Sequence, residues 1–478
     1  FSSREYHKFS TASLITRSTN DVQQVQQVMA MMFRIVLYAP ILGIGGVLKV
    51  LNTDSSMTWI LGVAVGLILI VIFVLFQVAM PKFTILQTLI DRLNLVSREI
   101  LTGIPVIRAF SREKHEEDRF EKANLDLTKT NLFVNRCMTF MMPIMMLIMN
   151  GVSVLIIYSG AHAVDNGTMQ VGNVMAFIQY AMQIIMSFLM ITAMSIMLPR
   201  ANVAALRIDE VLKTEVSIQD PETPVHPSES VKGEIEFEHV SFAYPEAGEN
   251  VLTDISFKAK KGQTIAVIGS TGSGKSTLIN LIPRYYDVTK GSVKVDGVDV
   301  RDMTQKELRD KLGYVPQKGV LFSGTIDSNI RYGKPEITDA QVKEAAEVAQ
   351  ATEFIDTKPE KYESPVSQGG TNVSGGQKQR LSIARAIAKD PEIFIFDDSF
   401  SALDFKTDSQ LRKALKEYTK DATTVIVAQR ISTILGADQI IVLDDGHMAG
   451  IGTHKELMAN CEVYQQIARS QLSEEELA

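Results

Sequence analysis

The feature that most constrains how this chain can fold is a stretch of 27 consecutive residues, between Asp54 and Lys82, without an acidic or basic side chain. Residues 59–78 of this stretch are almost wholly apolar, and a helix needs about 20 such residues to cross a bilayer. Three similar runs cover residues 21–49, 136–165 and 165–200. The first of these is interrupted only by Arg34, which we expect to face a cavity or lie near the membrane interface. Because such runs are rare in soluble cores, we expect four membrane-spanning helices.

The connections between these runs predict on which side of the membrane they lie. Residues 50–57 and 164–168 are short and carry little positive charge, so we expect them outside. Residues 82–136 contain ten Lys or Arg, which the positive-inside rule places in the cytoplasm. This segment is too long for a simple loop, so its helices are expected to continue well beyond the bilayer. We therefore expect a multi-pass protein of the cell membrane whose C-terminal half is cytoplasmic.

The composition changes after the last apolar run. Residues 213–232 are rich in Pro, Ser, Glu and Thr and predict a linker. We expect a membrane domain at 1–212, a second domain at 233–470 and a C-terminal tail at 471–478. In the second domain short strand-like runs alternate with helical patterns, which predicts an α/β fold with a largely parallel sheet. The net charge of −7 argues against nucleic acid as the main partner.

A glycine-rich motif, GSTGSGKST, begins at Gly269 and lies between a strand-like run and a helical segment. The motif and its context predict a P-loop, in which backbone N–H groups and a helix N-terminus hold phosphate oxygens. We expect Lys275 to reach the β- and γ-phosphates of a nucleotide and Ser276 to bind Mg²⁺. The expected nucleotide-binding residues are Gly269, Ser270, Thr271, Gly272, Ser273, Gly274, Lys275, Ser276 and Thr277. Asp397, which follows the apolar residues 393–396, is a second expected Mg²⁺ ligand.

Between these two motifs, a serine and two glycines open a helical segment. Here the sequence resembles the ABC transporter ATPases over residues 233–470. In that family this signature contacts the γ-phosphate of ATP bound to the opposite subunit, and a helix N-terminus suits that anion. The resemblance implies that the corresponding residues act in trans; they are Ser374, Gly375, Gly376 and Gln377.

The same resemblance assigns three further positions. Tyr244 lies where the family stacks an aromatic ring on adenine, although by itself it would be read as a core tyrosine. Gln317 matches the glutamine that contacts Mg²⁺ and the membrane domain, and residues 401–404 match the D-loop. ATP and Mg²⁺ are therefore the expected cofactors.

The membrane half resembles the exporters of this family, which have six spans fused ahead of one ATPase domain. Only four spans are visible and the sequence begins at Phe1 without a methionine, so we expect two preceding helices to be missing. Residues 9–19 and 110–120 resemble the cytoplasmic loops that carry coupling helices, and they could equally be solvated charged loops.

Two positions depart from the pattern of an active family member. Asp398 stands where the family has the glutamate that polarises the attacking water, and Gln429 stands where it has a switch histidine. A carboxylate one methylene shorter is misplaced by about 1 Å, which can cost on the order of 10²-fold in rate. Glutamine can donate to a phosphate but carries no positive charge. Both changes predict a degenerate hydrolytic site on this chain, as in one subunit of bacterial heterodimeric multidrug exporters. A heterodimer is therefore expected, with a homodimer as the alternative.

The leading functional prediction is ATP-driven export of hydrophobic or amphipathic small molecules. A lipid or peptide exporter and an ATP-gated or regulatory subunit remain alternatives, whereas the four spans argue against a soluble ABC protein. Thirteen of the 21 methionines lie between Met138 and Met197, and many recur at helical spacing. Such methionines could pack helices or face lipid; they could also form a deformable wall for apolar cargo.

Overall fold

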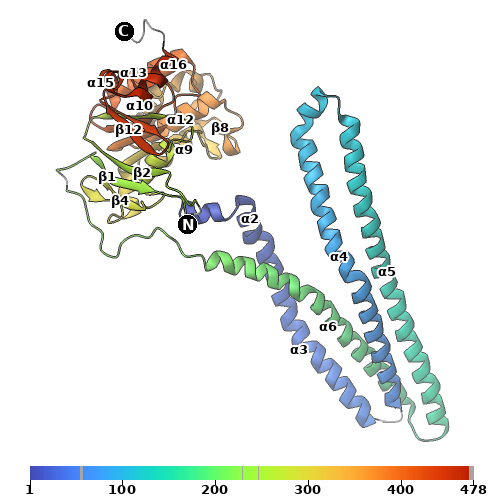
Figure 1. Ribbon diagram of the computed structural model, residues 1–478. Helices are drawn as coiled ribbons and strands as arrows, with labels where there is room; N and C mark the ends of the chain where they lie inside the picture. Colours follow the sequence, from blue (N-terminus) through green and yellow to red (C-terminus); the bar gives the residue numbers. More distant parts are fainter. Residues whose placement is uncertain (54–56, 229, 246, 473–478) are drawn as a thin grey trace. The chain divides into compact units, whose positions relative to one another are not determined.

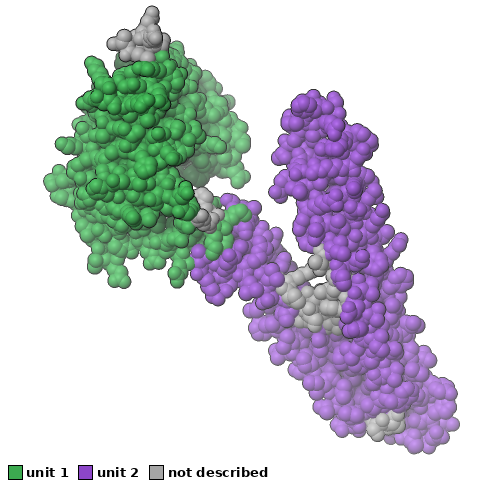
Figure 2. Space-filling model, in the orientation of Figure 1, with its two compact units in different colours: residues 1–10, 215–478 green, residues 11–214 purple. Residues whose placement is uncertain are grey.

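The computed structural model describes residues 1–53, 57–228, 230–245 and 247–472. Its contacts divide the chain into a helical unit, residues 11–214, and an α/β unit formed by residues 1–10 and 215–478 (Figure 2). The last helix of the helical unit ends at Leu212, and the first strand of the α/β unit begins at Ile235. The first ten residues thus group with the α/β unit, and the domain boundaries drawn from the sequence remain a prediction.

The helical unit consists of four long helices and a short N-terminal segment (Figure 1). Its elements are α2 (Thr11–Thr16), the π-helix η1 (Arg17–Asp21), α3 (Val22–Thr53), α4 (Thr58–Ala109), α5 (Glu113–Asp165) and α6 (Val171–Leu212). Four helices are long and apolar enough to cross a membrane, which confirms the predicted number of spans among the described residues. The 52 residues of α4 correspond to about 78 Å, more than twice the thickness of a bilayer core. The helices therefore extend beyond the bilayer, as the sequence predicted.

Two helix pairs build this unit, because α3 packs along α6 and α4 packs along α5 (Figure 1). Small residues allow the close approaches. A Cβ at Gly46 of α3 would lie 2.7 Å from the Ile184 side chain of α6, and between the two pairs one at Gly160 of α5 would lie 2.7 Å from Val174 of α6. Many large apolar side chains of these helices do not pack between the helices and are exposed, as expected for helices that face lipid.

Three sequence expectations change in this unit. Only Phe9 and Ser10 of residues 9–19 lie outside regular structure, because α2 and η1 continue directly into α3. Most of residues 110–120 belongs to α5, and only 110–112 connect α4 to α5. The predicted outer connection 50–57 is partly helical, since α3 extends to Thr53, and residues 54–56 lie outside the described residues. The side chain of Arg34 is also outside the described part, so its predicted environment stays a prediction.

Among its described residues, the α/β unit contains three sheets. Its strands are β1 (Ile235–Phe242), β2 (Leu252–Ala259), β3 (Thr264–Gly269), β4 (Lys290–Val295), β5 (Val298–Asp299), β6 (Leu312–Val315), β7 (Gly324–Thr325), β8 (Pro365–Val366), β9 (Ile393–Asp397), β10 (Thr423–Val427), β11 (Gln439–Asp444) and β12 (His447–Gly452). The largest sheet has the order β12-β11-β3-β10-β9-β6, and all its pairs except β11–β12 are parallel. The largely parallel sheet is thus confirmed. An antiparallel sheet, β2-β1-β4-β5, and the pair β7-β8 complete the unit.

Helices cover these sheets and carry several of the sequence motifs (Figure 1). They are α1 (Ser3–Lys8), α7 (Lys275–Leu281), α8 (Gln305–Asp310), α9 (Ile326–Ile330), α10 (Asp339–Val348), α11 (Thr352–Asp356), α12 (Gly375–Ala388), α13 (Phe405–Tyr418), α14 (Ile431–Ile434), α15 (His454–Asn460) and α16 (Glu462–Gln471), with 3₁₀ turns η3 (Arg331–Gly333), η4 (Lys361–Glu363) and η5 (Gln368–Gly370). Residue 471, assigned to a tail by the sequence, ends α16, and residues 473–478 lie outside the described part.

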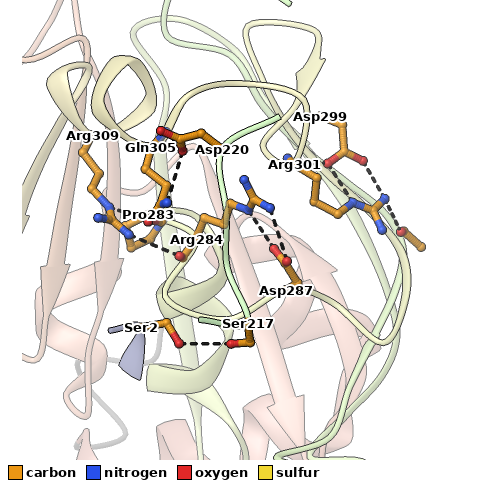
Figure 3. Close-up of polar contacts among 11 residues, drawn as sticks. Ser2, Ser217, Asp220, Pro283, Arg284, Asp287, Asp299, Arg301, Gln305 and Arg309 are labelled. Atoms are coloured by element: carbon orange, nitrogen blue, oxygen red, sulfur yellow. Dashed lines mark hydrogen bonds and ion pairs between the residues drawn. The ribbon is translucent and has the colours of Figure 1, made fainter. Parts of the chain in front are cut away.

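The segment between α6 and β1 has little regular structure but is held on the α/β unit by polar contacts (Figure 3). Asp220 accepts from the backbone N–H and side-chain amide of Gln305 at 2.9 and 3.1 Å, at the start of α8. The Val225 N–H donates to the Asp302 carbonyl oxygen at 2.8 Å. Ser2, which precedes α1, contacts Ser217 through the two hydroxyl groups at 3.2 Å. This segment therefore follows a defined path rather than a free one.

Candidate functional site

Four of the expected site segments follow neighbouring strands of the parallel sheet. The P-loop follows β3, Gln429 follows β10, the two aspartates stand at the end of β9, and Gln317 follows β6. Since the carboxyl ends of parallel strands meet at one edge of a sheet, the strand order β3-β10-β9-β6 collects these segments there. The sheet, rather than proximity in the sequence, therefore assembles the site.

The P-loop has the backbone conformation that its glycines allow. Gly272 and Gly274 adopt φ values of 87° and 95°, a left-handed region that residues with a Cβ rarely enter. Gly269 has another constraint, since a Cβ there would lie 2.1 Å from the Leu443 carbonyl oxygen of β11. The loop ends in α7, so its turn presents backbone N–H groups next to a helix N-terminus, an arrangement suited to phosphate.

Lys275 is folded back onto this loop. Its Nζ donates to the carbonyl oxygens of Gly269 at 2.9 Å and Ser270 at 2.7 Å. Burial lowers the pKa of Lys275, and the charges of Asp398 and Asp397 oppose that shift. The ammonium group is therefore held at the mouth of the loop by neutral acceptors, which an anionic phosphate can replace.

Ser276 and Asp397, two of the three predicted Mg²⁺ ligands, lie next to each other. The Ser276 hydroxyl donates to Asp397 Oδ1 at 3.0 Å, although the residues are 121 positions apart. Asp397 is buried; this burial raises its pKa, and the bond from Ser276 acts in the opposite direction. A hydroxyl and a carboxylate oxygen are hard ligands of the kind that Mg²⁺ prefers.

Asp398 is contacted by both of the other residues predicted to serve hydrolysis. The Gln429 amide donates to Asp398 Oδ2 at 2.7 Å, and the Gln317 amide donates to the same oxygen at 3.3 Å. Asp398 itself adopts φ 45°, and burial raises its pKa. One carboxylate oxygen is thus shared by two neutral amides, so the structure brings together the three residues expected to act in catalysis.

Tyr244 is half-buried, packs against the core and lies next to the helix that follows the P-loop. Its hydroxyl is 3.0 Å from Thr277 Oγ1, and its ring meets those of Phe242 and Tyr286 edge-on at centroid distances of 4.9 and 5.2 Å. Thr277 belongs to α7, so Tyr244 lies close to the phosphate-binding loop. This position is compatible with the adenine contact that the family resemblance implies.

The signature residues form the N-terminus of α12. Ser374 caps this helix by accepting from the Gln377 N–H at 3.3 Å, while the Ser374 N–H donates to Gln377 Oε1 at 3.1 Å. Ser374 and Gly375 are exposed, and a Cβ at Gly376 would lie 3.3 Å from the Ala402 carbonyl oxygen of the D-loop. Within the described residues no hydrogen bond joins this motif to the P-loop of the same chain.

Sequence reasoning missed several residues that hold these loops. Gln379 is buried in α12 and donates to the Pro316 carbonyl oxygen at 3.1 Å, directly before Gln317. Arg412 and Gln471 contact the backbone around Gln429. These partners are 20 to 63 positions apart, so no local pattern marks them.

Known proteins share both halves of this architecture. Residues 2–188 match the family model of the ABC transporter transmembrane region, and residues 252–401 match that of the ABC transporter. An uncharacterized ABC transporter ATP-binding protein of Mycobacterium tuberculosis is 43% identical over 98% of this chain and 81% of its own length. The chain belongs to the ABC transporters. Its resemblance to ABC ATPases, inferred from the signature, is therefore confirmed.

Further similarities identify the exporter type of ABC transporter. A putative multidrug export ATP-binding/permease protein of Bacillus subtilis is 36% identical over 95% of this chain and 78% of its own length. A fatty acid ABC transporter ATP-binding/permease protein of Mycobacterium tuberculosis is 33% identical over 96% of the chain and 72% of its own length. The structure of a bacterial Atm1-family ABC exporter with ATP bound matches with a TM-score of 0.81 and 25% identity, covering 99% of this chain and 83% of that one.

These findings establish the main predictions of class and activity. The chain is an ABC exporter half-transporter, with a helical transmembrane domain fused to an α/β ATPase domain. It is an ATP-driven translocase and a multi-pass protein of the cell membrane. ABC exporters work as dimers in the membrane, so this half-transporter requires a second one.

Proposed function

We propose that this chain is the weakly hydrolytic half of a heterodimeric exporter that moves hydrophobic or amphipathic molecules. The observation that carries the proposal is the 2.7 Å hydrogen bond from Gln429 to Asp398. The residues that replace the family's histidine and glutamate are hydrogen-bonded to each other, and one of the two carboxylate oxygens of Asp398 already accepts from amide groups. Glutamine carries no positive charge and the aspartate is one methylene shorter than glutamate, and both features weaken the activation of water. Removing a general base from an active site costs on the order of 10²–10⁴-fold in rate.

ATP binding at this site requires none of the weakened groups. The P-loop and Lys275 would bind the phosphates, and Tyr244 would stack on adenine. Ser276 and Asp397 offer two adjacent oxygens for Mg²⁺, and Gln317 is the third proposed ligand. Bound Mg²⁺ would neutralise charge on the β- and γ-phosphates. We therefore infer long ATP occupancy with slow turnover.

The signature would serve a different site from the P-loop of the same chain. Ser374 and Gly375 are exposed at a helix N-terminus, where the Ser374 hydroxyl and the Gly375 backbone could contact the γ-phosphate of ATP bound to the partner. In this arrangement the chain supplies an intact signature to the partner's competent site. Its own P-loop site would receive the partner's signature.

The cargo proposal rests on the apolar character of the helical unit. Met186 and Met190 lie one turn apart on α6 and are both exposed in this chain, so they can contact lipid or cargo. One relative is named for multidrug export and another for fatty acids, and both classes of cargo are apolar or amphipathic. Lipid export is therefore the second candidate.

The decisive experiment compares the two ATP sites in the complete transporter in lipid nanodiscs. We expect Asp398→Asn to lower total ATPase activity less than about twofold, because the residue contributes little to turnover. Replacing the catalytic glutamate of the partner by glutamine should lower activity by on the order of 10²-fold. Lys275→Ala serves as the control that prevents ATP binding at this site.

Other results would contradict the proposal. Equal losses from the two carboxylate substitutions would show that the site is not degenerate. A fully active homodimer of this chain would remove the need for a different partner. Ion currents without vesicle transport of dyes or lipids would instead establish an ATP-gated channel.

A further inference from the structure

The loop that carries Gln429 is held in place by a side chain from a distant helix. Gln471, the last residue of α16, donates from Nε2 to the Gln429 carbonyl oxygen at 2.8 Å. The Oε1 atom of the same amide accepts from the Ile431 N–H at 2.9 Å. Both ends of one side-chain amide thus bind the backbone on either side of Arg430.

The second of these bonds satisfies a group that the local structure leaves without a partner. Ile431 is the first residue of α14, and the first N–H groups of a helix lack intrahelical acceptors. Arg430 occupies the N-cap position but makes no capping bond with its side chain. The Gln471 side chain therefore caps the N-terminus of α14, a role that a neighbouring serine or aspartate has in other helices.

The helix that presents Gln471 is firmly anchored beneath the loop. Tyr464 and Ala468 of α16 are fully buried and pack in one cluster with Ile431 and Ile434 of α14. The Tyr464 hydroxyl is also 2.8 Å from His454 Nδ1 in α15. The amide thus projects from a packed surface and can define the position of the loop.

A second contact holds the other end of the same loop. Arg412 of α13 donates to the Ser432 carbonyl oxygen at 2.7 Å, and its guanidinium also binds the buried Asp408 carboxylate at 2.7 Å. Because α13 begins directly after the D-loop, the loop is held between two helices.

We propose that Gln471 is a positioning residue that keeps the Gln429 amide beside Asp398, so that the second N–H of this amide can contact the γ-phosphate of ATP. It acts through the backbone of the loop and touches no nucleotide. The inference rests on the proposed assignment of Gln429 to the ATP site. It does not require that the site be degenerate, since the same bonds would position a glutamine in a fast or a slow site.

The first test measures the loop itself by hydrogen–deuterium exchange in the nanodisc-embedded transporter. In Gln471→Ala the Ile431 amide should exchange about tenfold faster, because a lost hydrogen bond corresponds to roughly that factor. Gln471→Asn is one methylene too short to span both groups and should behave like alanine. Gln465→Ala is the matched control, because Gln465 lies on the same helix and donates to the Met458 carbonyl oxygen, away from the loop.

The second test separates positioning from general stability by comparing nucleotides with and without a γ-phosphate. Photolabelling of this chain by 8-azido-ATP should require about threefold to tenfold more nucleotide in Gln471→Ala. Labelling by 8-azido-ADP should be unchanged, since ADP lacks the group that Gln429 would contact. Gln471→Glu keeps the acceptor for Ile431 and should restore part of the ATP affinity.

Each test can overturn the proposal separately. Unchanged exchange at Ile431 in Gln471→Ala would show that the contact does not hold the loop. Equal losses of ATP and ADP labelling would indicate a structural role without positioning. A high ATP turnover at this site would contradict the degenerate site but leave the positioning role intact, so the two failures are distinguishable.

Discussion

At the scale of single residues, the hydrogen bonds of the Asp398 carboxylate bear most directly on how the ATP site could act. Asp398 Oδ2 accepts from Gln429 and Gln317, and both donors are neutral amides. A carboxylate that activates water must keep an oxygen directed at that water. The bonds from Gln429 and Gln317 engage one of the two carboxylate oxygens, while Ser276 and Asp397 lie next to each other. We therefore propose that this site binds ATP and hydrolyses it slowly.

This argument predicts that two substitutions together restore turnover. In Asp398→Glu/Gln429→His the carboxylate gains a methylene and the switch residue gains a titratable ring, so ATP hydrolysis at this site should rise at least about tenfold. Single-turnover assays in the transporter whose partner site is inactivated measure this rate. Asp398→Glu alone is the control and should recover less. No gain from the double variant would mean that features outside these two residues limit the site.

The predictability of the site follows from how far apart its residues are in the chain. The P-loop was predictable because its ligands are contiguous and a strand and a helix flank them. The contacts of Asp398 with Gln429 and Gln317 join positions 31 and 81 residues apart. They depend on the strand order β3-β10-β9-β6, which no local pattern encodes. The contacts of Gln471 with the Gln429 carbonyl oxygen and the Ile431 N–H also join distant positions, so no local pattern encodes them.

At the scale of elements, the length of the apolar runs predicted the long helices, whereas a short polar helix such as α1 had no such signal. The apolar runs identified α3 to α6 because a bilayer demands about 20 apolar residues. The polar segment before them hid α1, whose start is a capping box between Ser2 and Glu5. Glu5 also accepts from the Ser217 N–H at 3.1 Å, so α1 is bound to the segment that follows α6.

The charge of Glu5 should determine how firmly α1 is attached. Burial alone would raise the pKa of Glu5, but hydrogen bonds from Ser2 and Ser217 outweigh it and lower the pKa from 4.5 to about 2. A depressed folded-state pKa means that the stabilisation is complete above about pH 4.5 and is lost as the pH falls toward 2. Glu5→Gln should weaken the attachment at neutral pH by about 1–2 kcal/mol and remove this pH dependence.

Hydrogen exchange of residues 2–9 and 215–218 measures the attachment of α1. Glu222→Gln, an exposed position in the same segment, is the matched control and should leave exchange unchanged. If Glu5→Gln exchanges like the unmodified protein across this pH range, the carboxylate does not hold the two segments together.

At the scale of the whole molecule, an ATP-driven exporter must offer its cargo a surface within the membrane domain. The methionines of the last two spans divide into two groups in the structure. Met145 of α5 is only 3% exposed and packs in the helical core, as a packing role requires. Met186 and Met190 of α6 are 48% and 37% exposed and lie outside that core. The side chain of Met194, which also belongs to α6, lies outside the described residues.

The exposed pair carries the last prediction, which concerns cargo selection. Methionine is flexible and polarizable, so a wall containing Met186 and Met190 would adapt to several apolar molecules. The double substitution Met186→Ala/Met190→Ala shortens both side chains, so less apolar area would be buried against the cargo. The relative transport of large and small dyes should therefore change about threefold to tenfold. Met145→Ala is the contrasting variant, because emptying a core site should cost about 2–5 kcal/mol of stability and lower transport of all dyes alike. Transport ratios in proteoliposomes that stay constant in the double variant would assign the pair to lipid contact or helix packing. A selective loss of fatty-acid transport with unchanged dye ratios would instead favour lipid as the cargo.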